Sequence, residues 1–375
     1  MEKNVFGKEF RLGILGGGQL GRMFIQEAIN YNIDVHIMEN DDNAPSARIA
    51  TTFTKGEITD FDDVLAFGRD LNVLTVEIEN VNIEALYELE RQGVKVFPQA
   101  RVLEIIKDKG IQKEFYKNND IPSSDFVHYS KGQEISLPSV QKIRTGGYDG
   151  QGVKILKSKS DLNDLFSDPS IIEELISFSK ELSVIVARNE SGQTAVYQTV
   201  ECQFNEANLV EFLFSPAEIT IEIEKRATEL AVDVINKLEM VGILAVELFL
   251  TSDGKLYVNE VAPRPHNSGH HTIECNISSQ FEQHLRAILD LPLGSTEIIQ
   301  NGAMINLLGE TNYNGSAIYE GLEDVISIPG VHVHLYGKLT TKPHRKMGHI
   351  TVTNSSLSEA KRVAKIVKNK LKVIA

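Results

Sequence analysis

The chain has 375 residues, of which 42% are hydrophobic and 24% charged, with a formal net charge of −14. This balance is typical of a globular protein, and the acidic charge argues against a general nucleic-acid binder. There is no apolar run long enough to span a membrane and no secretion signal, and two cysteines are too few for a disulfide framework or a zinc cage. We therefore expect a cytoplasmic enzyme or binding protein of two or three domains.

The first hundred residues alternate between apolar runs and helical patterns. The apolar runs end at Leu15, Met38, Val76 and Val96, and the helical patterns span 19–31, 60–70 and 82–92. Alternation of this kind predicts a parallel sheet with helices on its faces.

A glycine loop, GGGQLG at 16–21, follows the first predicted strand and opens the first helix. With Glu39 at the end of the next strand, it fits the pattern of a dinucleotide-binding domain. The pattern is weak, because glycines here also let any phosphate or sugar approach the helix, or let the helix pack closely on a strand. A dinucleotide-dependent oxidoreductase therefore stays open as an alternative.

A second glycine-rich segment, TGGYDGQG at 145–152, lies between two predicted strands. A helical stretch at 100–118 precedes it, and short strand-like runs separated by turns fill 138–215, which indicates antiparallel structure. The segment lacks the lysine and following helix of a P-loop. We interpret it as a flap whose backbone N–H groups close over a polyphosphate, with Lys142 and Arg144 adding positive charge; the alternative is a flexible surface hairpin.

Two glutamates face each other in a predicted hairpin at 243–261. If Asp253 and Gly254 form a two-residue turn, Glu247 lies directly opposite Glu260, with Val258 on the same face. Carboxylates about 5 Å apart repel by roughly 3 kcal/mol at an effective dielectric near 20. A shared proton or a shared cation would relieve that repulsion. Mg²⁺ fits best, since it combines a few carboxylates with substrate phosphates. The alternative is a shifted turn register that puts the two glutamates on different faces.

The segment PRPHNSGHH at 263–271 leaves the second strand of this hairpin and must pass close to the predicted metal. Arg264, His266 and Asn267 are suited to binding anions or moving protons. A zinc site at His266 and His270 is a weak alternative, because no helix and no cysteine supports it.

The C-terminal end of the chain is basic. Residues 331–375 carry ten Lys or Arg residues against a single acid, Glu359. They divide into a loop at 332–349 and an amphipathic helix at 358–372. Either the helix has a basic solvent face, or part of the segment receives an anionic substrate.

Together these motifs resemble the ATP-grasp enzymes, and within them the 5-(carboxyamino)imidazole ribonucleotide synthetase family. The resemblance rests on GGGQLGRM at 16–23, TVEIENV at 75–81, RTGGYDG at 144–150, NEVAPRPHNSGH at 259–270 and YGK…RKMGH at 336–349. It covers nearly the whole chain. It implies an α/β ATP-grasp fold with a Rossmann-like parallel-sheet domain at 1–99, an ATP-grasp domain at 100–294 with a lid subdomain at about 120–180, and a C-terminal domain at 295–375.

The resemblance also implies an activity and its residues. The reaction is ATP-dependent carboxylation of the amine of 5-aminoimidazole ribonucleotide by bicarbonate, through carboxyphosphate, by a cytoplasmic homodimer. The implied ATP contacts are Lys109, Lys142, Gly147, Tyr148, Asp149, Gly150, Gln151, Gly152, Val153, Glu173, Glu174, Leu175, Ile176, Glu181, Asn259 and Glu260. The implied metal ligands, for Mg²⁺ or alternatively Mn²⁺, are Glu247 and Glu260. The implied ribonucleotide contacts are Gln19, Glu77, Glu79, Tyr148, Asp149, His266, Asn267, Lys338 and Arg345.

The catalytic residues implied are Asp149, His266 and Arg264. The sequence does not decide whether Asp149 or His266 accepts the proton of the reacting amine. The competing functions are another ATP-grasp ligase, such as a formate-dependent glycinamide ribonucleotide transformylase, the oxidoreductase mentioned above, and a non-catalytic binding protein. No nucleic-acid or membrane partner is expected.

Overall fold

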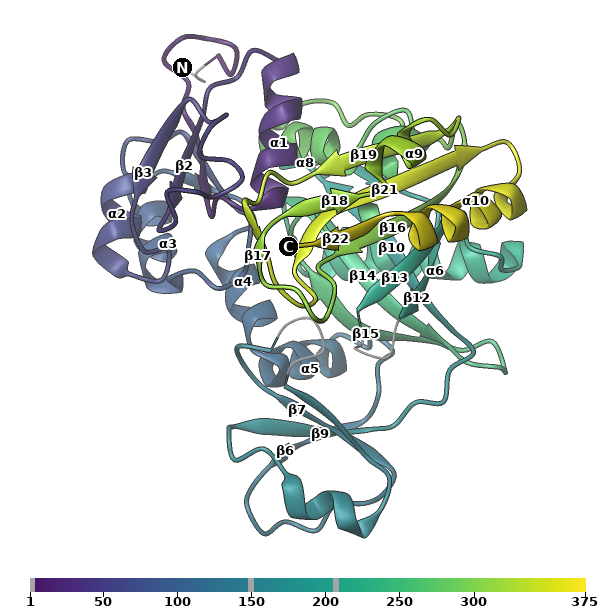
Figure 1. Ribbon diagram of the computed structural model, residues 1–375. Coiled ribbons are helices and arrows are strands. Elements are labelled where there is room, and N and C mark those ends of the chain that lie inside the picture. Colours follow the sequence, from purple (N-terminus) through teal and green to yellow (C-terminus); the bar gives the residue numbers. More distant parts are fainter. Residues whose placement is uncertain (1–3, 148–151, 205–208) are drawn as a thin grey trace.

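The computed structural model describes residues 4–147, 152–204 and 209–375. Its N-terminal part is a five-stranded parallel sheet with the strand order β3-β2-β1-β4-β5 (Figure 1). The elements are β1 (Leu12–Leu15), α1 (Gln19–Asn30), β2 (Val35–Glu39), β3 (Thr52–Lys55), α2 (Phe61–Gly68), β4 (Val73–Val76), α3 (Ile83–Arg91) and β5 (Lys95–Val96). The predicted parallel sheet is confirmed, although β3 was not foreseen because this edge strand is largely exposed and lacks an apolar run.

The helical stretch after this sheet is broken at Asp108 into α4 (Ala100–Lys107) and α5 (Lys109–Asn118). The Asp108 carboxylate accepts hydrogen bonds from the N–H groups of Gly110 and Ile111, which caps α5, and forms an ion pair with Arg144 at 2.6 Å. Asp108 therefore fixes Lys109 at the start of α5 and ties this helix to the strand that leads into the second glycine-rich segment.

A small antiparallel sheet with the order β6-β9-β7-β8 lies at the bottom of Figure 1. It comprises β6 (Phe126–Tyr129), β7 (Ser139–Ile143), β8 (Val153–Leu156) and β9 (Ser170–Glu174), with the short 3₁₀ helix η1 (Lys159–Asp164). This sheet lies within the range predicted for a lid subdomain. Its connection to the rest of the molecule includes an isolated bridge between Ser123 and Val258.

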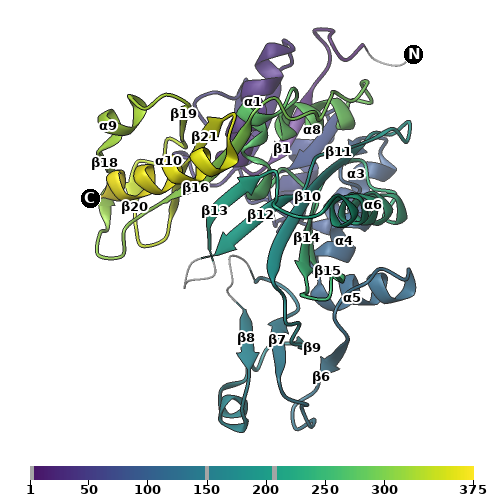
Figure 2. The same cartoon turned by 90° about the vertical axis from the view of Figure 1, so that its right-hand side faces the viewer.

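The largest sheet has nine strands and runs through the middle of the molecule (Figure 2). Its order is β15-β14-β10-β12-β13-β16-β21-β19, with β11 paired to β10. The strands are β10 (Lys180–Arg188), β11 (Thr194–Val196), β12 (Val200–Phe204), β13 (Val210–Ser215), β14 (Gly242–Leu250), β15 (Leu256–Ala262), β16 (Asn301–Leu308), β19 (Val331–Leu335) and β21 (Lys346–Asn354). The predicted antiparallel pattern is confirmed, and the C-terminal strands continue the central sheet through the pair β13 and β16.

The remaining elements cover or connect this sheet. They are α6 (Ile221–Lys237), η2 (Asn267–Gly269), α7 (Thr272–Cys275), α8 (Gln280–Ile288), β17 (Gly315–Ser316), β18 (Ile318–Glu320), α9 (Leu322–Ile326), β20 (Thr340–Thr341), α10 (Leu357–Lys370) and β22 (Lys372–Ile374). Helix α8 packs between α1 and β14, whereas α10 packs on β16 and β21. No helix among the described residues is long and apolar enough to cross a lipid bilayer.

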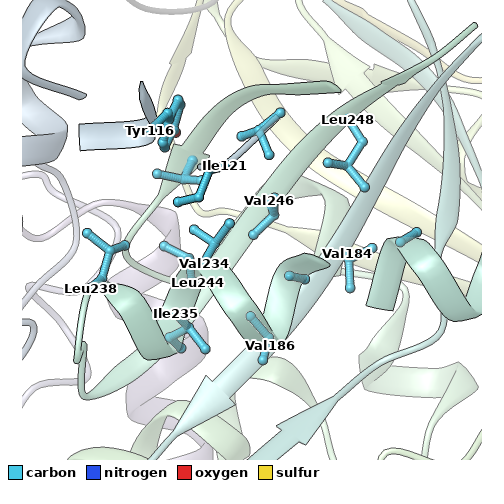
Figure 3. Packing of buried hydrophobic residues seen from close by; sticks show 14 of the residues in the cluster. Tyr116, Ile121, Val184, Val186, Val234, Ile235, Leu238, Leu244, Val246 and Leu248 are labelled. Atoms are coloured by element: carbon cyan, nitrogen blue, oxygen red, sulfur yellow. The ribbon is translucent and has the colours of Figure 1, made fainter. Parts of the chain in front are cut away.

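The main core lies between α6 and the sheet (Figure 3). Val234 and Ile235 of α6 pack against side chains of β10 and β14, including Val184 and Val246. The same face of β14 extends to Leu248, which is 1% exposed. Since strand side chains alternate between faces, burial of these even-numbered residues directs Glu247 to the opposite side of the sheet.

The basic C-terminal helix is partly balanced by acids of neighbouring elements. Lys361 of α10 pairs with Glu218, and Lys368 pairs with Glu211 of β13 at 3.5 Å. The charge of this helix therefore contributes to its packing against the sheet, apart from the basic loop that precedes it.

Candidate active site

The paired glutamates lie opposite each other on β14 and β15, as predicted, but for a different reason. Leu248 pairs with Val258, whereas Glu247 pairs with Glu260, so Asn259 is an extra residue that forms a β-bulge. The turn is also longer than predicted, because Thr251 N–H donates to the carbonyl of Lys255 at 3.0 Å. The longer turn shifts the register by one residue, and the bulge shifts it back.

The predicted surroundings of the pair need one correction. Val258 was expected beside the carboxylates, but it is 1% exposed and belongs to the core beneath α6. The bulge is the cause: it lets the strand change its alternation at Asn259, so Val258 stays with the core while Glu260 faces Glu247. The bulge thus places both Asn259 and Glu260 where they contact the site lysines.

The two carboxylates have opposite electrostatic environments. Burial, with the charge of the facing Glu260, raises the pKa of Glu247 from 4.5 to about 8. Lys109, whose Nζ lies 2.6 Å from Glu260 Oε2, is the main reason that the pKa of Glu260 falls to about 2. Lys109 therefore gives Glu260 a direct countercharge, and a cation bound between the two carboxylates would give one to Glu247.

Lys142 lies on β7 of the small antiparallel sheet, and its side chain reaches the bulge at Asn259. Its Nζ donates to Asn259 Oδ1 at 3.0 Å and forms an ion pair with Glu173 Oε2 at 3.1 Å. Although burial opposes it, Lys142 and Lys113 hold the pKa of Glu173 below its ordinary value. Ser124 Oγ also donates to Glu173 at 2.9 Å. The Glu173 side chain therefore holds Lys142 in place, and the backbone of Glu173 is left for the ATP contact that the family resemblance implies.

Glu181 is the second residue of β10, where it pairs with Phe249 of β14 and Cys202 of β12. Burial, with the charge of Glu260, raises the pKa of Glu181 to about 7. A small pocket at this position brings several predicted residues together; it is lined by Glu181, Leu182, Cys202, Phe204, Glu247, Leu248, Phe249 and Asn259. Glu174 ends β9, and Leu175 and Ile176 follow it toward β10; their ATP contacts stay a prediction.

The segment after β15 passes beside Glu247, as predicted. His266 Nε2 lies 3.7 Å from Glu247 Oε1, and Arg264 Nε lies 2.9 Å from Glu79 Oε1. Within the described residues, neither amide atom of Asn267 has a hydrogen-bond partner, although both are buried. Because buried polar groups are normally paired, Asn267 has the hydrogen-bonding capacity that a bound ligand would use.

The protonation of His266 follows from its neighbours. Its Nδ1 accepts a hydrogen bond from Ser268 N–H at 3.3 Å and lies 2.9 Å from Ser268 Oγ. Nδ1 is therefore an acceptor, so a neutral ring carries its hydrogen on Nε2, the nitrogen that faces Glu247. Burial and the nearby charges of Arg264 and Lys346 lower the pKa of His266 to about 3. His266 is thus a neutral donor toward Glu247.

The first glycine loop is occupied by a carboxylate of the protein itself. A Cβ atom at Gly18 would lie 2.1 Å from Glu77 Oε1, and one at Gly21 would lie 2.9 Å from Glu77 Oε2. Burial raises the pKa of Glu77 to about 7, and the N–H groups of Gly18 and Gly21 oppose that rise. Glu77 takes the place at the start of α1 where a dinucleotide phosphate would bind, which removes the support for the oxidoreductase. Gln19 is the first residue of that helix.

The basic C-terminal loop contributes a residue that sequence reasoning missed. Lys338 Nζ donates to the carbonyl of Lys346 at 2.7 Å, and Arg345 donates to Thr340 within its own loop. The charge of Lys346 opposes the rise that burial and Glu260 cause in the pKa of Glu247, and it adds to the fall that burial and Arg264 cause in the pKa of His266. Arg345 and Lys346 are adjacent cations in the sequence, and only the fold shows that the charge of Lys346 acts on Glu247.

The second glycine-rich segment is described only at its ends. Lys142 pairs with Val153 in the hairpin of β7 and β8, and Ile143 N–H donates to the carbonyl of Gly152 at 2.9 Å. Gly146 and Gly152 both adopt positive φ, of 80° and 78°, which favours glycine. Gly147 is described, whereas the predicted contacts at Tyr148, Asp149, Gly150 and Gln151 lie outside the described residues.

A small antiparallel sheet whose lysine reaches a hairpin with two facing glutamates, on a central antiparallel sheet, is the arrangement of an ATP-grasp ligase. Family models agree along the chain: a ribonucleotide synthetase preATP-grasp domain matches residues 10–107, an ATP-grasp domain matches 114–281, and a phosphoribosylaminoimidazole carboxylase C-terminal domain matches 302–363. The N5-carboxyaminoimidazole ribonucleotide synthase of Synechococcus elongatus is 35% identical over 364 residues, which cover 94% of this chain and 91% of that protein.

Solved structures agree closely. The N5-carboxyaminoimidazole ribonucleotide synthetase of Thermotoga maritima is 40% identical, with a TM-score of 0.91 and coverage of 98% of this chain and 99% of that one. The Aspergillus clavatus synthase in complex with ADP and 5-aminoimidazole ribonucleotide is 32% identical, with a TM-score of 0.88 and coverage of 96% and 98%. The chain belongs to the N5-carboxyaminoimidazole ribonucleotide synthase family.

Some relatives in this family are longer proteins. The phosphoribosylaminoimidazole carboxylase of Ogataea methanolica is 38% identical over 372 residues, which cover 94% of this chain and 68% of that protein. The chain spans about two thirds of the length of the yeast and plant relatives of that name.

Proposed function

We propose that this protein carboxylates the exocyclic amine of 5-aminoimidazole ribonucleotide, using ATP and bicarbonate and releasing ADP and phosphate. The observation that carries the proposal is that the hairpin glutamates lie beside the polar segment that follows the hairpin. Glu260 faces Glu247 and pairs with Lys109, while the segment that follows places His266 beside the same Glu247. The next residue, Asn267, has two buried amide atoms with no partner in the part of the chain that the structure describes. A phosphoryl donor and a second substrate would therefore meet at Glu247.

The nucleotide side of the site holds cations that have internal partners. Lys109 and Lys142 are held by Glu260, Glu173 and Asn259, so both ammonium groups are positioned before the nucleotide binds. A bound triphosphate would replace or share these contacts. Because phosphoryl transfer depends mainly on positioning and charge neutralisation, fixed lysines favour catalysis.

Glu247 and Glu260 are the residues that would hold Mg²⁺, with Mn²⁺ as an alternative. The fit rests on Glu247, which burial and the facing Glu260 keep protonated near neutral pH, so that a bound cation would favour its charged form. Two carboxylates leave most of the coordination to water and substrate phosphates, as Mg²⁺ prefers. When bound, the metal would neutralise charge on the transferring phosphoryl group.

Bicarbonate is a poor electrophile, and phosphorylation to carboxyphosphate would activate it for attack by the amine. The amine must then lose a proton. His266 is poorly suited to accept it, because its Nδ1 already accepts from Ser268 and its pKa is low. We therefore assign proton acceptance to Asp149 and a donor role to His266, with Arg264 held in place by Glu79. Homodimer assembly and a cytoplasmic location stay predictions of the family resemblance.

Phosphate release from ATP and Mg²⁺ tests this function directly. One reaction contains bicarbonate with and without 5-aminoimidazole ribonucleotide, and a parallel reaction contains formate with and without glycinamide ribonucleotide. We expect strong stimulation only by the first pair. Stimulation by the second pair would favour the transformylase alternative, and stimulation by neither would refute both substrate assignments.

A further inference from the structure

Gln280, the first residue of α8, holds the backbone of His266 from both sides. The N–H of His266 donates to Gln280 Oε1 at 2.8 Å, and Gln280 Nε2 donates to the carbonyl of His266 at 2.8 Å. The same Nε2 lies 2.9 Å from His270 Nδ1. Gln280 is fully buried, so water does not compete for these bonds. One side chain thus satisfies the two backbone groups of His266 and orients the ring of His270.

Gly269 makes this contact sterically feasible. A Cβ atom there would lie 2.3 Å from Gln280 Oε1 and 2.5 Å from its amide carbon, so any other residue would displace the amide. Gln280 is itself held by its backbone N–H, which donates to Thr272 Oγ1 at 2.8 Å. The position of the Gln280 amide is therefore fixed by the segment that it holds.

Through its contact with His270, the Gln280 amide also links the segment of His266 to the C-terminal strands. The His270 ring lies 4.6 Å from the ring of His349 on β21, measured between centroids, and Tyr336 Oη lies 3.0 Å from His349 Nδ1. Gln280 donates to His270 Nδ1, which places the hydrogen of a neutral His270 on Nε2. The Gln280 side-chain amide thus fixes the backbone of the segment that carries His266 and Asn267.

We propose that Gln280 is a positioning residue for the carboxylation reaction: its amide fixes His266 and the adjoining Asn267 in the geometry that receives the ribonucleotide. This inference rests on the proposed function for its kinetic consequence, but the positioning of His266 can be measured without any substrate. Displacement of a substrate-contacting group by about 1 Å can reduce the reaction rate by about 100-fold.

Gln283, one turn further along α8, is a matched control. Its Oε1 accepts from the N–H of Gly294 at 2.7 Å, and its Nε2 donates to the carbonyl of Gly294 at 2.9 Å. Like Gln280 it is fully buried. The two glutamines have the same chemistry and the same two-point clamp, but Gln283 holds the loop that follows α8 and not the segment of His266.

The kinetic test compares Gln280→Glu with Gln283→Glu. Each variant keeps the acceptor oxygen and loses the amide donor. We expect kcat/KM for 5-aminoimidazole ribonucleotide to fall about 100-fold in Gln280→Glu and to stay within about threefold of the parent in Gln283→Glu. KM for ATP should stay within about threefold in both variants. Equal ribonucleotide kinetics in the two variants would overturn the proposal, because the effect would then be one of general stability.

The second test uses ¹⁵N-labelled histidine and needs no substrate. The ring nitrogen shifts of His266 and His270, assigned with His266→Asn and His270→Asn, should change in Gln280→Glu and not in Gln283→Glu. Gln280→Met, which preserves shape, serves if the glutamate variant does not fold. Unchanged His266 and His270 signals would refute the positioning role even if the wild-type protein used another ribonucleotide. Shifted signals with no response to aminoimidazole ribonucleotide would instead refute the proposed substrate alone.

Discussion

Replacement of Glu247 by Gln should stabilise the protein while abolishing its ATP turnover. Gln has the shape of a protonated Glu, so the substitution removes only the charge that the native site opposes. Burial and the facing Glu260 raise the pKa of Glu247 from 4.5 to about 8. The unfolded chain therefore releases this proton at a lower pH than the folded chain does, and native stability falls as pH rises from about 4.5 to 8.

The magnitude follows from that pH window. At pH 7 the unfolded state has passed its pKa of 4.5 by about 2.5 pH units, while folded Glu247 is still largely protonated. At about 1.4 kcal/mol per pH unit, the native protein loses up to about 3 kcal/mol that Glu247→Gln would retain. The difference between the two proteins should be close to zero at pH 4.5 and largest at pH 8.

Urea denaturation at pH 5, 6, 7 and 8, without metal or nucleotide, measures this difference. Glu323→Gln, which changes an exposed glutamate on α9, is the control and should show no such trend. Phosphate release in the Glu247→Gln variant should fall to background, because a metal ligand is lost. A free-energy difference that does not grow with pH would refute the electrostatic reasoning, whatever happens to activity.

Three further predictions concern the same site. Glu260→Gln should remove the ion pair that holds Lys109 and lower phosphate release by at least about 100-fold with the fold retained, since charge stabilisation is a large catalytic term; near-normal release by a folded variant, judged by circular dichroism, would contradict the metal assignment. Arg345→Ala should raise KM for the ribonucleotide by about 10-fold or more with KM for ATP unchanged, as the loss of a charge-assisted contact implies; an unchanged KM would place the phosphate elsewhere. Gly18→Ala should destabilise the protein by about 1–3 kcal/mol in urea, because its Cβ would lie 2.1 Å from Glu77 Oε1; a neutral result would mean that the Glu77 carboxylate moves freely.

The hairpin illustrates how far the sequence could be interpreted. Strand pairing, the facing glutamates and the nearby PRPHNSGHH segment were all predicted from residue spacing and confirmed. The predicted turn was one residue too short and the bulge was not predicted, and these two errors cancel at Glu247 and Glu260. Neither the longer turn after Thr251 nor the bulge at Asn259 has a distinctive local sequence. The bulge depends on tertiary contacts, among them the hydrogen bond from Lys142 to Asn259.

The sequence did not reveal the residues that influence the site through their contacts with other residues. In the sequence Gln280 is an ordinary helix residue, because its role depends on the backbone of His266, which is 14 positions away in the chain. Lys346 stands beside Arg345 in one basic run, and local pattern does not separate them. The ribonucleotide contact of Glu77 stays a prediction, and the sequence did not indicate that its carboxylate lies among the glycines of the first loop, because only the folded sheet creates that approach.

The continuous nine-stranded sheet has a consequence for how this chain can be divided. Strand β13 pairs on one side with β12 and on the other with β16, so residues before 216 and after 300 share one ladder of hydrogen bonds. Removal of the C-terminal segment would leave unpaired those N–H and C=O groups of β13 that face β16, and it would uncover Phe214, which is 3% exposed in the intact chain. An exposed, apolar strand edge promotes aggregation. A fragment cut at that point would therefore precipitate, and the C-terminal strands cannot be exchanged as a separate module.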